Sequence, residues 1–196
     1  MFLTNLPFHP AFNPILVNND VTLRKPEIDD HQDWASLRDK SRDHLVAWEE
    51  NWPPEELSLS AFKKRLRSYE QEMSKGAGLH LLIIRREDRR LLGGASLTNI
   101  RYGASRSGLL GYWLGVENTG HGYASSAVEA LMRHAFEGIE LNRLEAACQP
   151  ENSASRKLLE RCGFQEEGLA KEYLRINGRW RDHMIYAVTA SSFKKP

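Results

Sequence analysis

Cysteine is scarce in this sequence: only Cys148 and Cys162 occur among 196 residues, and they form no CxxC pair. This scarcity excludes a disulfide framework and a cysteine-based zinc site. It suits a reducing compartment, so we expect a cytoplasmic protein that needs no metal. Cys148 lies in an apolar run and Cys162 precedes a glycine, and we predict that both thiols serve packing.

An excess of one charge is also absent, since 27 Lys and Arg residues stand against 26 Asp and Glu residues. No overall field therefore favours nucleic acid or a membrane as a partner. The chain shows no repeats, and the three prolines within residues 1–20 predict an extended arm rather than a targeting or membrane-spanning segment. The length suits a single domain over 1–196.

Hydrophobic periodicity predicts alternating strands and helices. The almost wholly apolar run 107–116 indicates a central strand covered on both faces, and Asn177-Gly178 indicates a terminal hairpin in which Trp180 packs in the core. The other predicted elements are a strand at 21–26, helices at 27–40 and 58–74, a hairpin over 79–101, a helix at 124–136, a strand at 142–149 and a helix at 153–162, capped by Asn152 and ended by Gly163. This order predicts an α/β (α+β) fold with a mixed sheet and helices on both faces.

Two glycines, Gly120 and Gly122, stand just where the helix at 124–136 begins. The first N–H groups of a helix lack intrahelical partners, and glycine lets an anion approach the backbone closely, so phosphate is the natural ligand. A P-loop is excluded because Tyr123 and Ala124 follow Gly122 in place of Lys-Ser/Thr. A dinucleotide fingerprint is disfavoured because three strands precede the motif. Glycines that serve only a tight turn stay an open alternative.

Three motifs carry a family resemblance. The turn Gly120-x-Gly122-Tyr123-Ala, the pair Asn152-x-x-Ser155 and the run LERCGF at 159–164 together resemble the two core motifs of the GNAT superfamily of acyl-CoA-dependent N-acetyltransferases. DHLVAWEE at 43–50 and EGLAKEYLRINGRWRDHMIYAV at 167–188 are similar to the RimJ branch of the RimJ/RimL-type ribosomal-protein N-acetyltransferases.

The resemblance implies a GNAT fold, with a mixed, mostly antiparallel twisted sheet of about six or seven strands. It implies acetyl-CoA as co-substrate and, as acceptor, the N-terminal alanine of small-subunit ribosomal protein S-five, free or in a pre-ribosomal subunit. A monomer or a homodimer is expected. Acetylation of a small amine, such as a polyamine, an amino acid or an antibiotic, is the alternative. A ribosome-assembly or acetyl-CoA-binding factor with incidental catalysis is another.

The resemblance also implies which residues hold acetyl-CoA. The pantetheine arm would bond to the backbone of Leu114, Gly115 and Val116, where an amide near Val116 would polarise the thioester, and to Asn152, which a helix cap explains equally well. The pyrophosphate would rest on the amides of Gly120, His121, Gly122, Tyr123, Ala124 and Ser125. Glu117 stands where the family often has Gln or Arg, and we expect it to point away from the phosphates.

The chemistry is direct attack of an amine on the thioester. An N-terminal amine, with a pKa of about 7.7 to 8.0, is roughly one-tenth neutral at pH 7, so it needs only a weak base. We predict Glu49 as this base, with Glu50 as its rival, and Ser155 as the acid, with Tyr173 and Tyr186 as alternatives. The segment WEENWPPEE at 48–56 is predicted to form an acidic and aromatic lip for a basic tail. The predicted acceptor-binding residues are Trp48, Glu50, Trp52 and Tyr173.

Overall fold

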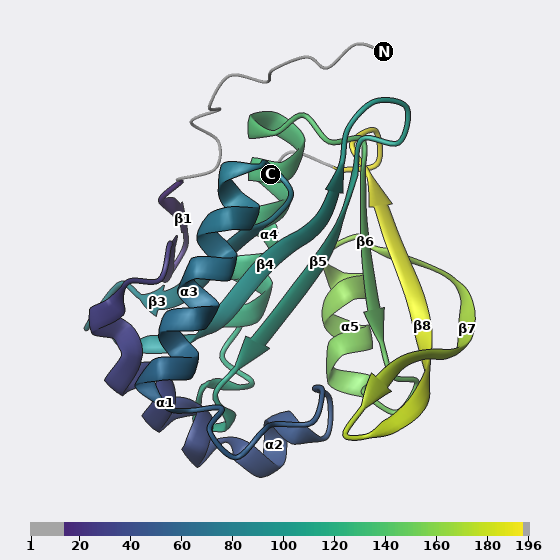
Figure 1. Cartoon of the computed structure of the whole chain (residues 1–196). Helices are drawn as coiled ribbons and strands as arrows, with labels where there is room; N and C mark the ends of the chain where they lie inside the picture. Colours follow the sequence, from purple (N-terminus) through teal and green to yellow (C-terminus); the bar gives the residue numbers. More distant parts are fainter. Residues whose placement is uncertain (1–13, 194–196) are drawn as a thin grey trace.

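The computed structural model describes residues 14–193, in which eight strands form one sheet in the order β1-β2-β3-β4-β5-β6-β8-β7 (Figure 1). Only the β5–β6 pair is parallel among these strands. The strands are β1 Leu16–Asn18, β2 Val21–Arg24, β3 Leu79–Arg85, β4 Leu91–Arg101, β5 Ser107–Leu114, β6 Arg143–Cys148, β7 Gln165–Ile176 and β8 Arg179–Thr189. The predicted mixed, mostly antiparallel sheet is therefore confirmed.

The helices agree with the predicted order. They are the 3-10 turn η2 Ile28–Asp30, α1 His31–Lys40, α2 Arg42–Val46, α3 Leu59–Ser74, the 3-10 turn η3 Val116–Asn118, α4 Tyr123–Arg133, the π turn η4 His134–Gly138 and α5 Ser153–Arg161. Within residues 14–193, no helix combines the length and the apolar character needed to cross a membrane.

Near the end of the extended arm predicted over 1–20, three residues form the edge strand β1. Leu16–Asn18 pairs antiparallel with β2 through a tight turn in which Asn19 has φ +46°, a conformation that asparagine tolerates better than most residues. Residues 1–13 lie outside the described part of the chain. This short edge strand brings the sheet to eight strands.

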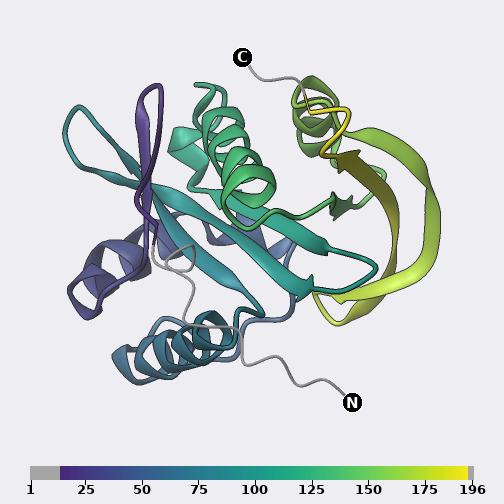
Figure 2. The ribbon, with the colours of Figure 1, turned by 90° about the horizontal axis from the view of Figure 1, so that it is seen from above.

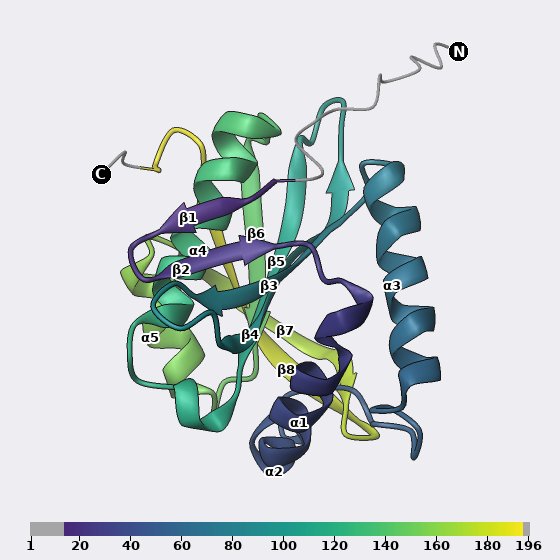
Figure 3. The same ribbon diagram turned by 90° about the vertical axis from the view of Figure 1, so that its left-hand side faces the viewer.

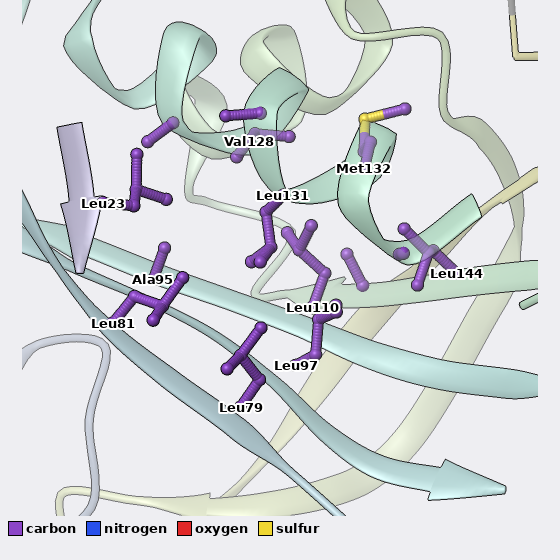
Figure 4. Packing of buried hydrophobic residues seen from close by; sticks show 14 of the residues in the cluster. Leu23, Leu79, Leu81, Ala95, Leu97, Leu110, Val128, Leu131, Met132 and Leu144 are labelled. Carbon is purple, nitrogen blue, oxygen red and sulfur yellow. The ribbon is translucent and has the colours of Figure 1, made fainter. Parts of the chain in front are cut away.

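Helices cover both faces of the sheet, with α1 and α3 on one side and α4 and α5 on the other (Figure 3). The larger core lies under α4, where Val128 and Leu131 pack toward Leu23, Ala95 and Leu110 from the strands (Figure 4). The apolar spacing that predicted a helix over 124–136 produces this contact. The helix begins one residue earlier, at Tyr123, and its predicted end lies in the π turn.

β5 and β6 diverge along their length (Figure 1). Their parallel pairing covers only Ser107–Leu109 against Arg143–Glu145, whereas β5 continues to Leu114 beside β4. Leu110 and Leu114 are buried, but Gly111, Tyr112 and Trp113 between them are only half-buried. The prediction of a strand covered on both faces is therefore wrong for this end of β5, because cavities open beside it.

The predicted terminal hairpin is confirmed. Asn177 and Gly178 both have positive φ, 43° and 76°, as a two-residue turn requires in a twisted hairpin. Two register shifts accompany the strong curvature of β7 and β8 (Figure 2). Trp180 is 61% exposed, so its predicted core position is wrong, because it pairs with exposed Arg175 beside the turn.

Candidate functional site

Two neighbouring cavities open beside the end of β5. The turn cavity, about 420 Å³, lies between the glycine turn before α4 and the start of α5. The tryptophan cavity, about 510 Å³, lies over β3, β4 and β5 beside α1, α3 and the 48–53 segment. Both cavities are lined by Trp48, Glu49, Tyr112 and Trp113, which we call the shared wall. A reaction between two bound molecules would take place at this wall.

The glycine turn has the backbone that the sequence predicted. Gly120 and Gly122 have φ +79° and +82°, and a Cβ atom on either would meet no atom within 4 Å. The glycines therefore leave open space in front of the amides that begin α4, which suits an anion. Upstream, buried Asn118 donates its side-chain N–H to Leu92 O at 3.1 Å and fixes the turn to β4.

The structure brings most of the predicted acetyl-CoA residues together. Of that set, the turn cavity is lined by Leu114, Gly120, Gly122, Ala124, Ser125, Asn152 and Ser155. His121 and Tyr123 are not among its lining residues, and their rings stack on each other with centroids 5.7 Å apart. Glu117 pairs with Arg90, which stands just before β4, so its carboxylate points away from the glycine turn as expected.

The backbone N–H groups of Leu114, Gly115 and Val116 differ in their hydrogen bonds. The Gly115 N–H donates to Leu92 O at 2.9 Å, and the Val116 N–H donates to Ser41 Oγ at 2.9 Å. The Val116 amide, predicted to polarise the thioester, thus already has a partner. Because N–H groups alternate along a strand, the Leu114 amide faces the gap between β5 and β6.

Basic side chains on α5 also line the turn cavity, and the sequence analysis missed them. Lys157 and Arg161 lie on the same helical face as Ala154 and Leu158, so the three- and four-residue spacing would have found them. Their charges favour an anionic ligand. His44 from α2 lines the same cavity.

Ser155 stands at the start of α5, where Asn152 Oδ1 accepts the Ser155 backbone N–H at 3.0 Å. The predicted helix cap is therefore confirmed. Ser155 Oγ lies 2.7 Å from the hydroxyl of Tyr112, a residue that the sequence analysis did not select. Burial raises the pKa of the Tyr112 phenol, while its hydrogen bond to Ser155 acts the other way.

Both cysteine predictions agree with the structure. Cys148 is buried and Cys162 is half-buried against the main core. Burial raises the pKa of the Cys148 thiol, with a hydrogen bond to Ser155 opposing the shift. Burial also raises the pKa of Cys162, to about 11. Both thiols therefore stay protonated near neutral pH.

A buried arginine organises the tryptophan cavity. Arg38, 5% exposed, has its guanidinium carbon 4.3 Å from the Trp52 ring centroid, 5.0 Å from that of Trp113 and 5.3 Å from that of Trp34. Its Nη2 lies 2.5 Å from Glu49 Oε2, and Trp52 Nε1 donates to the same oxygen at 2.8 Å. These contacts fix the Glu49 carboxylate at the shared wall.

The predicted acidic lip carries less unpaired negative charge than its sequence suggested. Of its four glutamates, Glu49 pairs with Arg38 and Glu56 pairs with Arg65, whereas Glu50 and Glu55 are exposed. The two arginines come from α1 and α3, 11 and 9 residues from their partners, and no local sequence pattern predicted these pairs. The free negative charge of the lip is therefore about half of that predicted.

Two predicted hydroxyl groups lie away from both cavities. Tyr186 is fully buried, and its hydroxyl accepts from Arg156 Nε at 3.1 Å and donates to Glu166 at 3.1 Å. Tyr173 is 41% exposed, and its ring packs edge-on against His183. Neither residue lines the turn cavity or the tryptophan cavity, because the curved hairpin directs them elsewhere. Their role as alternative acids stays a prediction.

A histidine missed by the sequence analysis lines the tryptophan cavity. His80 stacks on Tyr69 with ring centroids 3.8 Å apart, and its Nε2 lies 3.0 Å from Glu72 Oε2. Burial lowers the pKa of His80, although the bond to Glu72 opposes this. The imidazole is therefore neutral near pH 7. On the adjacent strands its cross-strand neighbours are Ser96 and then Gly111.

Arg38→Ala is expected to lower the free energy of unfolding by about 3 kcal/mol, because it leaves Glu49 without its cation in a partly buried site. Arg42→Ala, which removes an exposed arginine that also lies near Trp52 and pairs with Asp39, is the control. It should cost less than about 1 kcal/mol. Urea denaturation measures both, and equal losses would contradict the prediction.

Comparison with known proteins agrees with this geometry. Residues 20–165 match the family described as an acetyltransferase (GNAT) domain. The probable N-acetyltransferase YjcK of Bacillus subtilis is 30% identical over 89% of this chain and 96% of its own length. The ribosomal protein uS5 alanine N-acetyltransferase of Escherichia coli is 29% identical over 83% of this chain and 84% of its own.

Solved structures give the same result. Mycobacterium smegmatis RimJ, in complex with CoA-disulfide, superposes with a TM-score of 0.91 and 31% identity, covering 95% of this chain and 92% of that one. The matched domain spans the glycine turn, β3, β4, β5 and α5. The chain is therefore a member of the GNAT acetyltransferase family, with RimJ/RimL ribosomal-protein N-acetyltransferases among its relatives.

Proposed function

We propose that this enzyme transfers an acetyl group from acetyl-CoA to the N-terminal α-amine of a ribosomal protein, the alanine of small-subunit protein S-five. The observation that carries the proposal is the pair of cavities joined at the shared wall. One suits an anionic cofactor and the other an amine. The relatives named for ribosomal-protein alanine acetylation support this acceptor.

Acetyl-CoA fits the turn cavity by the chemistry of its walls. The pyrophosphate would lie on the amides that follow Gly120, with Lys157 and Arg161 balancing its charge. The pantetheine arm would run along the open edge of β5, where the Leu114 amide faces the gap. This places the thioester at the shared wall, near Ser155. Ser155 would then protonate the departing thiolate.

The acceptor amine would enter through the tryptophan cavity and meet the thioester beside Glu49. We assign Glu49 to the acceptor side, where its charge attracts an N-terminal ammonium. Its Oε2 atom already accepts from Arg38 and Trp52, so taking a proton would weaken this ion pair. Trp48 and exposed Glu50 line the same cavity and would contact the residues that follow the N-terminus.

The acceptor assignment predicts a substrate order. Thiol release from acetyl-CoA is measured with an alanine-first ribosomal peptide, its serine-first twin, the same peptide with a blocked N-terminus and free lysines, and spermidine. We expect turnover only with free N-termini, because an N-terminal amine is far more often neutral at pH 7 than lysine. Among these, the alanine-first peptide should be fastest, in line with the relative named for alanine acetylation. Turnover with spermidine alone would establish a small-amine acetyltransferase instead. Binding of CoA without turnover would favour an assembly factor.

The glycine turn predicts a matched pair of variants. Gly122→Ala and Gly103→Ala each put a side chain at positive φ, +82° and +72°, with no atom within 4 Å of the new Cβ. Each should cost about 1 to 2 kcal/mol in unfolding free energy. Only Gly122→Ala should weaken CoA binding in calorimetric titration, because Gly103 does not line the turn cavity. Equal CoA affinities of the two variants would show that the glycine turn is not part of the cofactor site.

Glu49→Gln separates acceptor binding from base catalysis. We expect a rise of at least about 10-fold in the peptide KM and a smaller change in kcat, because a lost charged contact costs about 1.5 to 3 kcal/mol. Glu55→Gln, an exposed change in the same segment, is the control. A fall in kcat at unchanged KM would instead make Glu49 the base that the sequence predicted.

A further inference from the structure

Tyr112 on β5 lines both cavities, and its hydroxyl contacts the hydroxyl of Ser155, which lines the turn cavity. We propose that Tyr112 and Ser155 form a two-hydroxyl relay that carries a proton from the acceptor nitrogen to the CoA sulfur. The inference rests on the proposed acetyl transfer, and it adds a residue that no sequence motif indicated.

The geometry suits a relay. The two hydroxyl oxygens are 2.7 Å apart, the ordinary length of an O–H···O hydrogen bond, and either can be the donor. Ser155 is held in place because its own N–H donates to Asn152 Oδ1. Tyr112 is held by β5, between β4 and the open gap. The pair therefore joins a residue that lines both cavities to one that lines the turn cavity.

The reaction needs such a transfer. As the amine attacks, a C–N bond forms at the thioester carbon, the C–S bond breaks, and its electron pair remains on sulfur. The nitrogen must lose one proton and the sulfur must gain one. In the relay, Tyr112 takes the nitrogen proton while giving its own to Ser155, which gives its proton to sulfur. The products are the amide and the neutral CoA thiol, and both hydroxyls return to their starting state.

Neighbouring groups are less suited to this transfer. The Glu49 Oε2 atom accepts from Arg38 and Trp52, which opposes proton uptake. Cys148 lies beside Ser155, but its thiol is buried. Burial also keeps the Tyr112 phenol protonated near neutral pH, because it raises the phenol pKa. A neutral phenol that accepts one proton as it gives another needs no phenolate intermediate.

The test uses Tyr112→Phe, Ser155→Ala and the double variant in the full-length enzyme, with Tyr102→Phe as the control. The Tyr102 hydroxyl donates to Gly76 O, outside both cavities, so its loss should leave turnover unchanged. We expect each relay variant to lower kcat about 100-fold with KM for acetyl-CoA unchanged. The double variant should be no slower than either single variant, because the loss of one hydroxyl already stops proton transfer through the relay.

A solvent isotope measurement separates a relay from a structural role. The wild-type enzyme should have a lower kcat in D₂O than in H₂O, and this isotope effect should reflect the transfer of more than one proton. Both single variants should lose this multi-proton isotope effect. Full kcat in either Tyr112→Phe or Ser155→Ala would overturn the relay, as would losses that multiply in the double variant. These outcomes leave the proposed function standing, whereas absence of turnover in the wild type would defeat the function itself. CoA titration and thermal unfolding check that each variant is folded.

Discussion

The parting of β5 from β6 after three residue pairs is the constraint on which the site depends. Up to Leu109 the two strands satisfy each other's backbone groups, and beyond it β5 is paired only with β4. The open edge exposes backbone polar groups that a ligand can satisfy, because buried N–H and C=O groups need partners. It also gives room for two cavities to meet. The glycine turn, α5 and the 48–53 segment all border this opening.

Around the opening, a second constraint is the burial of Arg38. Removing a guanidinium from water is costly unless it is paired, and here Glu49 and three tryptophan rings surround it. The hairpin turn adds a backbone contact, since the Asn177 N–H donates to Glu49 O at 2.9 Å. Segments from α1, the 48–53 loop and the C-terminal hairpin therefore meet at one residue, Glu49. The position of Glu49 depends on all three segments.

Local sequence signals predicted the fold well where one element decides its own shape. The apolar steps of α4, the Asn152 cap and the Asn177-Gly178 turn act within a few residues, and each was confirmed. Predictions failed where position relative to other elements mattered. Trp180 is apolar but stands at an uncovered hairpin tip, and Leu16–Asn18 forms a strand because β2 is beside it.

For the site, the sequence by itself determined the glycine turn and the residues at the start of α5, because both are local motifs. It also determined the family, through motifs that keep a fixed order along the chain. Only the tertiary structure decided that Tyr112 would meet Ser155, and that Arg38 would bind Glu49. Those pairs join residues 43 and 11 positions apart. Such contacts depend on how strands and helices pack together, which local periodicity does not encode.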